Sequence, residues 1–226
     1  MALLLLIGNK NYSSWSLRPW IAMKVAGIPF EEQVISLDAA DFKERVHKIS
    51  AAGKVPALAD GETQVWESLA ILDYLAEKFP QARLWPAEAR ARAHARSIAA
   101  EMHSGFTPLR RHFPMNVRRP VRPRAPTTEA ADNIKRIDAM WTDCRGRFGQ
   151  AGPFLFGAFG AADAMYAPVV SRFHTYAVDL SPVARAYVEA VMSLPAWADW
   201  SAAARVEPWV LPSDEVDWPT VLQPGD

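Results

Sequence analysis

The chain has 226 residues, half of them hydrophobic, and its formal net charge at pH 7 is zero. This length is enough for one large domain or two modest ones, and the balanced charge gives no global sign of binding to nucleic acid or membrane. The single cysteine, Cys144, excludes an intramolecular disulfide framework and a Cys-rich metal site, so we expect a protein of the reducing cytoplasm with no bound metal.

The first eighty residues alternate between strand and helix signals. Leu3–Ile7 is a continuous apolar run too short for a membrane span, and Ser16 can cap a following helix with Pro19 in its first turn. Asp60-Gly61 is a strong hairpin signal. In chain order the predicted elements are a strand at 3–7, a helix at 16–27, a strand within 30–37, a helix at 38–48, strands at 55–59 and 63–65, and a helix at 68–79.

This order predicts a small mixed sheet covered by helices, with its first two strands parallel. Beyond a proline-bounded connector at 79–86, helical periodicity dominates. The helical signals are two apolar stripes at 98–113 and 134–148, an acid in a first turn at 160–163 and a helix start at Ser181-Pro182. The pattern also predicts a loop at 115–126 and an extended surface tail at 207–226. We therefore predict an α+β protein with a βαβαββα domain at 1–80 and an all-helical domain at 87–226.

Lys54-Val55-Pro56 and Glu67-Ser68 are the most informative short motifs. A proline that opens an apolar strand belongs at an edge, a strand start or a bulge. If its peptide bond is cis, the backbone of the preceding residue is free to pair with a bound peptide. Glu67 and Ser68 lie at a strand-to-helix junction, where free N–H groups and the helix dipole favour a carboxylate. Together these motifs predict a pocket for a small peptide-like ligand.

These motifs, together with the segment Asn11–Arg18 and the helical second half, resemble the cytosolic glutathione S-transferases, in particular serine-type, zeta- and theta-like bacterial members. Phe156–Asp163 is similar to the family segment that ends in a helix-capping box, with Gly160 in place of the usual Ser or Thr. The resemblance implies a thioredoxin-like domain that binds glutathione as co-substrate, and a helical domain that supplies the pocket for a small-molecule electrophile. It also implies a homodimer with a role in detoxification.

By this resemblance, five residues hold glutathione. The backbone of Val55, before Pro56, pairs with the cysteinyl part, and Glu67 and Ser68 hold the amine and carboxylate of the γ-glutamyl part. Lys54 meets the glycyl carboxylate, a role that suits a flexible cation.

The thiolate of glutathione is the nucleophile, and a hydroxyl that donates to the sulfur at a helix N-terminus favours this anion. Counting back from Arg18 as in serine-type members selects Ser14 or Ser13, and we choose Ser14 ahead of Ser13. We interpret Ser16 as a helix cap and Arg18 as a structural residue.

Three functions remain open. The first is transfer of glutathione to a small hydrophobic electrophile. The second is a cis–trans isomerase similar to maleylacetoacetate isomerase, because Ser13-Ser14-Trp15 resembles the Ser-Ser-Cys motif of that class, although Trp15 stands in place of the cysteine. The third is a non-catalytic binding protein with this fold, against which the retained motifs argue.

The stretch 83–124 contains ten arginines, no lysine and two acids. We interpret it as a solvated face, and the alternative is that Arg110, Arg111 or Arg118 meets an anionic electrophile. Cys144 lies on an apolar helical stripe and is interpreted as a buried small hydrophobe. The histidines do not have metal-ligand spacing, and we expect His103 to be solvated or packed rather than to face the electrophile pocket.

Overall fold

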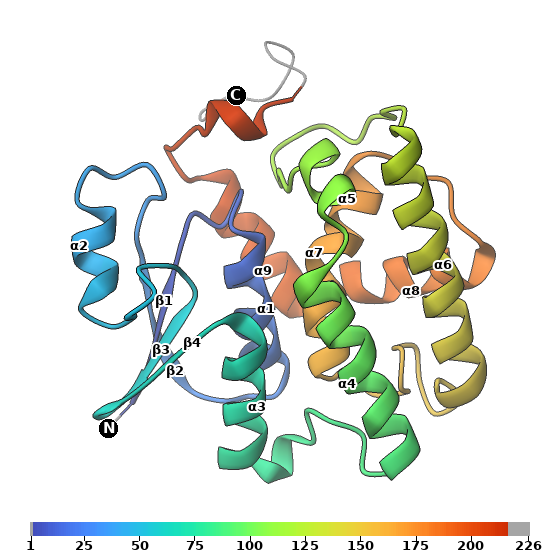
Figure 1. Cartoon of the computed structure of the whole chain (residues 1–226), viewed down its shortest axis with the longest axis horizontal. Coiled ribbons are helices and arrows are strands. Elements are labelled where there is room, and N and C mark those ends of the chain that lie inside the picture. The colour runs from blue at the N-terminus through green and yellow to red at the C-terminus, as the bar shows by residue number, and fades with distance from the viewer. Residues whose placement is uncertain (1, 217–226) are drawn as a thin grey trace.

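A four-stranded sheet with the order β2-β1-β3-β4 organises the first part of the chain (Figure 1). The computed structural model describes residues 2–216. β1 (Leu3–Ile7) pairs with β2 (Phe30–Val34) in parallel and with β3 (Ala57–Asp60) antiparallel, and β3 continues through a hairpin into β4 (Thr63–Trp66). β1 is the apolar run of the sequence because it is a central strand with both faces covered. The four predicted strands occur in the predicted chain order and the first two are parallel, but β3 begins at Ala57, so Val55 and Pro56 precede the strand instead of opening it.

Helices cover both faces of this sheet. Leu3, Leu5 and Ile7 belong to the main hydrophobic core together with α1 (Ser14–Val25) and α3 (Ser68–Lys78). Leu6 points the other way and packs in a second cluster with the short helix α2 (Phe42–His47). This division follows from the period of two in a strand, which sends alternate side chains to opposite faces.

The start of α1 differs from the prediction. The helix begins at Ser14 rather than after Ser16, and Ser13 occupies the N-cap position. Ser16 does not cap the helix, because its hydroxyl accepts a hydrogen bond of 3.0 Å from the backbone N–H of Gly8. Pro19 consequently lies inside the helix rather than in its first turn. A tertiary contact from the end of β1 therefore takes the oxygen that the sequence pattern assigned to capping.

The remainder of the described chain is helical apart from loops and two isolated β-bridges within 154–158. After the 3₁₀ turn η1 (Pro80–Ala82), the elements are α4 (Ala89–Ser104), α5 (Thr107–His112), α6 (Thr128–Phe148), α7 (Ala161–Thr175), α8 (Pro182–Met192), α9 (Pro195–Arg205) and the 3₁₀ turn η2 (Pro212–Asp214). The predicted stripe at 98–113 is divided between α4 and α5, where Phe106 adopts a left-handed backbone with φ of 58°. Ser181 caps α8 as predicted. The fold class is thus α+β, as expected.

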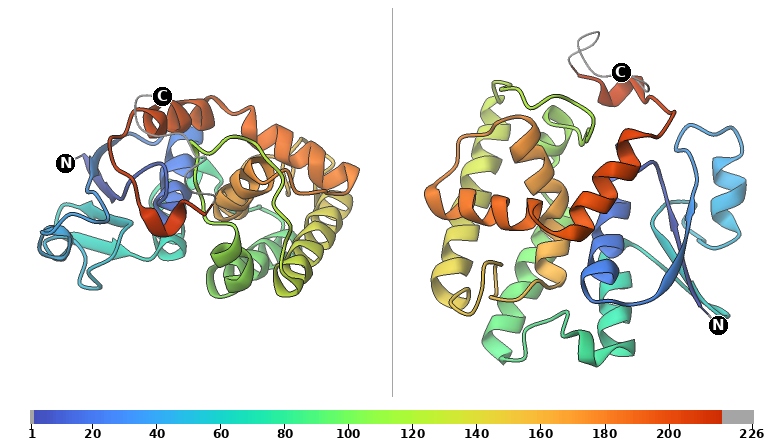
Figure 2. Two further views of the ribbon diagram at one scale, coloured as in Figure 1. Left: turned by 90° about the horizontal axis from the view of Figure 1, so that it is seen from above. Right: turned by 180° about the vertical axis from the view of Figure 1, so that it is seen from behind.

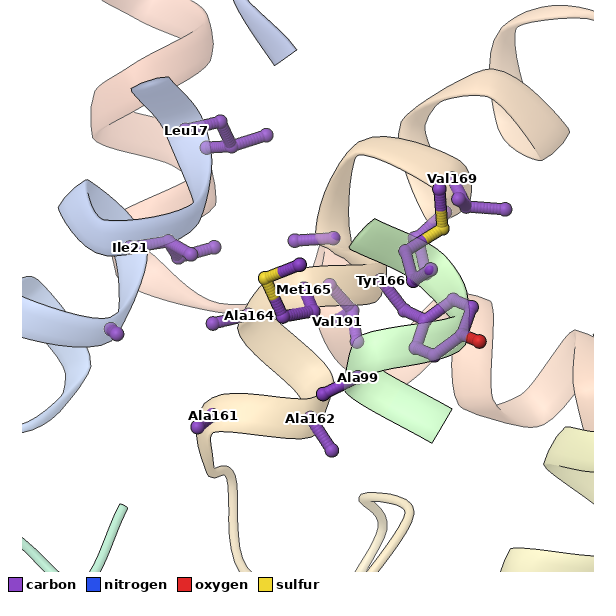
Figure 3. Close-up of a cluster of buried hydrophobic side chains, with 14 of the residues drawn as sticks. Leu17, Ile21, Ala99, Ala161, Ala162, Ala164, Met165, Tyr166, Val169 and Val191 are labelled. Carbon is purple, nitrogen blue, oxygen red and sulfur yellow. The ribbon is translucent and has the colours of Figure 1, made fainter. Parts of the chain in front are cut away.

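Helix α7 lies at the centre of the molecule and joins its two parts. Every residue of α7 except His174 is buried. Leu17 and Ile21 of α1 lie opposite Ala164 and Met165 of α7 (Figure 3). Each large apolar side chain buried in this contact contributes roughly 1.5–3 kcal/mol. Helix α9 also packs against α1 (Figure 2).

The start of α7 is stabilised by a buried carboxylate. Asp163 accepts hydrogen bonds from the backbone N–H groups of Leu155 (3.0 Å) and Gly160 (2.9 Å), and burial raises the pKa of its carboxyl to about 6. A Cβ atom at position 160 would lie 2.7 Å from the carbonyl oxygen of Leu84, which explains the glycine. The capping box therefore keeps the bond from the Gly160 N–H to the Asp163 carboxylate and lacks only the bond from an N-cap side chain, for which there is no space.

Cys144 is fully buried on α6, as its place on the apolar stripe predicts. Burial raises the pKa of its thiol to about 12. A thiol in this environment is neither a nucleophile nor a metal ligand at neutral pH.

Candidate functional site

A pocket of about 210 Å³ brings together the two short motifs of the first part of the chain. The residues that line it are Trp15, Ala52, Lys54, Val55, Pro56, Trp66, Glu67, Ser68 and His103. All five residues predicted to hold glutathione are among them. Larger hollows of about 390 and 480 Å³ lie elsewhere, one beside the linker before α4 and one along α6. Size does not select the site, because only the smaller pocket combines an ammonium, a carboxylate and an imidazole at the start of a helix.

One wall of the pocket is the segment that leads into β3. The Val55–Pro56 peptide bond is cis. Within residues 2–216, the backbone N–H and C=O of Val55 make no backbone hydrogen bond, because ladder pairing starts only at Ala57. Lys54 is exposed, and its ammonium forms no ion pair with any described side chain. A peptide backbone and an anion can therefore approach this wall without displacing existing partners.

A second wall is the start of α3. Glu67 occupies the N-cap position with φ of 69°, a left-handed conformation that is unfavourable for a residue other than glycine. Strained backbone of this kind is concentrated at ligand sites. Ser68 is buried as the first helical residue, and its hydroxyl has a weak contact of 3.9 Å with the sulfur of Met165. The free N–H groups of the first helical turn and the helix dipole make this wall favourable for a carboxylate.

His103 closes the pocket from the helical part of the chain. Its Nε2 atom lies 3.6 Å from Oε2 of Glu67, and its ring contacts the edge of Trp15 at 5.4 Å between centroids. Its buried Nδ1 atom has no hydrogen-bond partner among the described residues. His103 is packed, as one of the two expected states, and it also lines the pocket of the two short motifs, which the sequence did not predict. Helical spacing shows that His103 lies near an apolar stripe, but it does not reveal which neighbouring element that face meets.

The two candidate serines lie beside the pocket rather than among its lining residues. Both are about 7 % exposed, and both precede Trp15, which does line the pocket. The hydroxyl of Ser13 is 2.7 Å from that of Ser16, so it is already engaged. The hydroxyl of Ser14 makes no hydrogen bond to any residue in 2–216. Of the two, only Ser14 therefore has a hydroxyl that a ligand can use without breaking an existing bond.

Two guanidinium groups lie over the indole ring of Trp15. The Cζ atom of Arg18 lies 3.9 Å and that of Arg110 lies 4.4 Å from the centroid of the indole ring. Arg18 is fully buried and donates to the carbonyl oxygens of Ser14 and Met165, which fixes α1 against α7. Burial lowers the pKa of both guanidinium groups. The structural role predicted for Arg18 is thus a bridge between two helices, made to carbonyl groups rather than to a carboxylate.

The guanidinium of Arg110 has no hydrogen bond or ion pair within residues 2–216, and its Nε atom is buried without a partner. It is half-buried against the indole that forms one wall of the pocket. Arg111, its neighbour on α5, is exposed. Of the three arginines considered for an anionic electrophile, Arg110 is the one beside the pocket.

Two sequence predictions fail around the loop at residues 9–13. Arg118 is neither solvated nor near the pocket: it is buried and donates to the hydroxyl of Tyr12 (2.8 Å) and to the carbonyl oxygens of Glu207 (2.8 Å) and Trp209 (2.6 Å). The predicted surface tail is also wrong in its first part, since Glu207 and Glu215 are buried, while residues 217–226 lie outside the described residues. Both errors arise from contacts between residues about ninety or more positions apart.

Within residues 2–216, no group of three or more His, Cys, Asp or Glu side chains is arranged to hold a metal ion. None of the helices in that range is both long and apolar enough to cross a membrane.

Comparison with known proteins places these features in context. The family models for the N-terminal and C-terminal domains of glutathione S-transferase match residues 12–78 and 124–203. Maleylacetoacetate isomerase of Rattus norvegicus is 30% identical over 180 residues, which cover 76% of this chain and 79% of that protein. A probable maleylacetoacetate isomerase of Caenorhabditis elegans is 38% identical over 101 residues, 44% of this chain and 46% of that protein. The match thus spans less than half the length of the nematode protein.

Among solved structures, a glutathione transferase homolog from Burkholderia with bound glutathione superimposes with a TM-score of 0.68 at 22% identity. The match covers 91% of this chain and 98% of that one. A theta class glutathione S-transferase from Xanthomonas axonopodis pv. citri, also with glutathione bound, gives a TM-score of 0.65 at 21% identity and covers 88% of this chain and 97% of that one. At these identities the superpositions establish a common fold.

Proposed function

The chain belongs to the glutathione S-transferase family, and from this premise we propose that it is a glutathione transferase whose Ser14 hydroxyl stabilises the glutathione thiolate for attack on a small hydrophobic electrophile. The observation that carries the proposal is the convergence of Lys54, Val55, Glu67 and Ser68 on one pocket beside the start of α1. These residues come from separate elements, and what they share is a fit to one charged tripeptide.

Glutathione offers two carboxylates, one ammonium and two amide groups, and the pocket has a counterpart for each kind. The γ-glutamyl carboxylate fits the N-terminus of α3 at Ser68, and the ammonium fits the carboxylate of Glu67. The unpaired backbone of Val55 fits the cysteinyl amide groups. The glycyl carboxylate fits Lys54, whose ammonium is otherwise without an ion pair in the described chain. With the γ-glutamyl end at α3 and the glycyl end at Lys54, the cysteinyl sulfur is directed towards the first turn of α1.

Activation of the thiol needs only a modest free energy. A free thiol has a pKa of about 8.5, so ionisation near pH 7 requires a shift of roughly 1.5 units, or about 2 kcal/mol. A hydrogen bond from Ser14 to the charged sulfur supplies about 1.5–3 kcal/mol, and the N-terminus of α1 adds about 0.3–1 kcal/mol. The thiol proton leaves to solvent while Ser14 keeps its own. The thiolate then forms a carbon–sulfur bond, and the leaving group departs with its electron pair.

Isomerisation is the second candidate, supported by the names of the curated relatives and by the cationic surroundings of Trp15. In that reaction the same thiolate adds reversibly to a conjugated double bond, the resulting single bond rotates, and the thiolate is expelled. The two reactions share the thiolate and differ in whether glutathione stays attached to the product. We also propose, on the ground of family membership, that the protein is a cytoplasmic homodimer, which sedimentation analysis can test.

Three assays test these proposals. The first is calorimetric titration with glutathione and S-methylglutathione. The second is conjugation to an aryl halide, and the third is cis–trans isomerisation of a cis enone carboxylate. We expect both peptides to bind, because the peptide contacts do not need the thiol, and conjugation to require the free thiol. Absence of binding at millimolar glutathione would refute both catalytic proposals and leave the non-catalytic binding protein. Turnover in the third assay without glutathione consumption would favour the isomerase.

A further inference from the structure

The loop at residues 9–13, which leads from β1 to the candidate serines, is enclosed by the segment that follows α9. We call this segment, residues 207–216, the C-terminal strap. The two carboxylate oxygens of Glu207 accept hydrogen bonds from consecutive backbone N–H groups, those of Lys10 (2.7 Å) and Asn11 (3.0 Å). α9, which leads into the strap, packs beside α1 (Figure 2). A carboxylate that is 8% exposed and almost two hundred residues away thus fixes two successive peptide groups of the loop.

A second contact holds the same loop through its side chains. The hydroxyl of Tyr12 donates to Oε1 of Glu215 at 2.6 Å and accepts from Arg118 at 2.8 Å. Asn116 donates to Oε2 of Glu215 at 2.8 Å, and its own amide oxygen accepts from Asn11 at 3.0 Å. Three segments that are distant in sequence therefore meet in one buried hydrogen-bonded network. Each carboxylate oxygen of Glu215 has a donor in this network, whereas the buried Nε atom of Arg118 has no partner among the described residues. Buried networks of this kind favour a single arrangement of the backbone.

The loop needs this support because little of its own structure fixes it. It lies outside the sheet ladder, and its internal backbone bonds are turns back to Asn9, namely Tyr12 N–H at 3.2 Å and Ser13 N–H at 2.8 Å. These turns set the local curvature, and tertiary hydrogen bonds set the position of the loop relative to α3 and the pocket. Besides those of the strap, these bonds include one from the N–H of Leu37 to Oδ1 of Asn9 (2.8 Å) and one from Nε1 of Trp200 to the carbonyl oxygen of Lys10 (2.9 Å). A misplacement of about 1 Å in a catalytic group can lower a rate roughly a hundredfold.

We propose that the C-terminal strap positions the catalytic loop, with Glu207 as the positioning residue that sets where the Ser14 hydroxyl meets the glutathione sulfur. This inference rests on the proposed function. Glu207 does not touch the ligand pocket, and its effect passes through the backbone of Lys10 and Asn11. The pocket residues Lys54 and Glu67 lie on other elements, so glutathione affinity and thiol activation separate experimentally.

The substitution Glu207→Gln leaves the size of the side chain nearly unchanged but replaces one acceptor oxygen with an NH₂ group. One of the two loop N–H groups then loses its acceptor and faces another donor, so the loop must shift. Asp214→Asn is the matched control, since it changes a carboxylate to an amide in the same strap and the hydrogen bond that Asp214 makes is to its neighbour Ser213.

The experiment titrates the thiolate absorbance of bound glutathione against pH in the full chain, with glutathione affinity and thermal unfolding measured in parallel. For Glu207→Gln we expect the bound thiol pKa to rise by about one unit, kcat below that pKa to fall about tenfold, and affinity to stay within about twofold. For Asp214→Asn we expect no change in thiol pKa. If Glu207→Gln does not fold, Glu207→Asp, which is one methylene too short to reach both amides, carries the same expectation.

An unchanged thiol pKa in folded Glu207→Gln would overturn the inference, as would an equal rise in both variants. Wild-type protein that binds glutathione without forming a thiolate would refute the proposed function and this inference with it. If wild type forms the thiolate and folded Glu207→Gln forms it with the same thiol pKa, the inference alone is refuted.

Discussion

Replacing Ser13 and Ser14 one at a time by alanine separates the two candidate hydroxyls, because the structure gives them different surroundings. The hydroxyl of Ser13 is hydrogen-bonded to that of Ser16 at 2.7 Å, whereas the hydroxyl of Ser14 has no partner in the described chain. If Ser14 is the activating residue, its removal affects the bound thiol and not the fold. Removal of Ser13 affects the fold and not the thiol. The two variants should therefore show opposite patterns in two measurements.

The magnitudes follow from the bonds that are lost. Ser14→Ala removes a charge-assisted hydrogen bond of about 1.5–3 kcal/mol, which corresponds to a rise of roughly one to two units in the pKa of the bound thiol. Its unfolding free energy should stay within about 0.5 kcal/mol of wild type. Ser13→Ala removes one neutral hydrogen bond of about 0.5–1.5 kcal/mol and lowers Tm by about 2–4 °C. Ser16 keeps its bond to the N–H of Gly8.

The assay is the pH titration of thiolate absorbance for bound glutathione in each variant, with chemical unfolding on the same samples. A raised thiol pKa in Ser14→Ala alone supports the assignment. The reasoning is refuted if Ser13→Ala raises the thiol pKa while Ser14→Ala does not. If neither variant changes it, the activating group is not one of these hydroxyls, and the helix N-terminus or another donor must supply the effect.

Three further outcomes can be measured. Burial raises the pKa of Asp163 in the folded protein to about 6, so the folded form takes up a proton before the unfolded form as pH falls. Wild type should therefore gain up to about 3 kcal/mol of unfolding free energy relative to Asp163→Asn between pH 7 and pH 4, which urea titrations can measure. Arg110→Ala should raise KM about tenfold for a carboxylated electrophile but not for an uncharged one, with exposed Arg111→Ala as the control, and equal effects on both electrophiles would contradict the anion role. Lys54→Ala should weaken glutathione binding about three- to tenfold and leave an analogue amidated at glycine unaffected, which calorimetry can check.

The sequence was sufficient for those parts of the fold that depend on local pattern. The run Leu3–Ile7, the hairpin at Asp60-Gly61 and the cap at Ser181 each rest on neighbouring residues, and each appears in the structure as expected. The start of α1 was misplaced because the Ser16 hydroxyl has two possible uses, and the choice is made by the Gly8 N–H from the end of β1. A one-dimensional pattern does not contain that contact.

For the candidate site, the sequence grouped Lys54-Val55-Pro56 with Glu67-Ser68, and both motifs line one pocket because each has its own local backbone geometry; their contact with glutathione stays a prediction. His103, Trp15 and the strap were missed or misjudged because their roles come from packing between distant segments. An arginine-rich stretch gives the same composition whether a given guanidinium is solvated, as in Arg111, or buried among carbonyl oxygens, as in Arg118. The contacts in the folded structure distinguish the two cases.

The burial of Cys144, the single cysteine, has a practical consequence for each of these experiments. With a thiol pKa of about 12 and no exposed surface, the native protein contributes no background to a colorimetric thiol reagent. Any rapid thiol signal in a mixture with glutathione therefore reports glutathione alone, free or bound. Cys144 becomes reactive only when α6 separates from the core, so the rate of its slow labelling reports the unfolding of each variant.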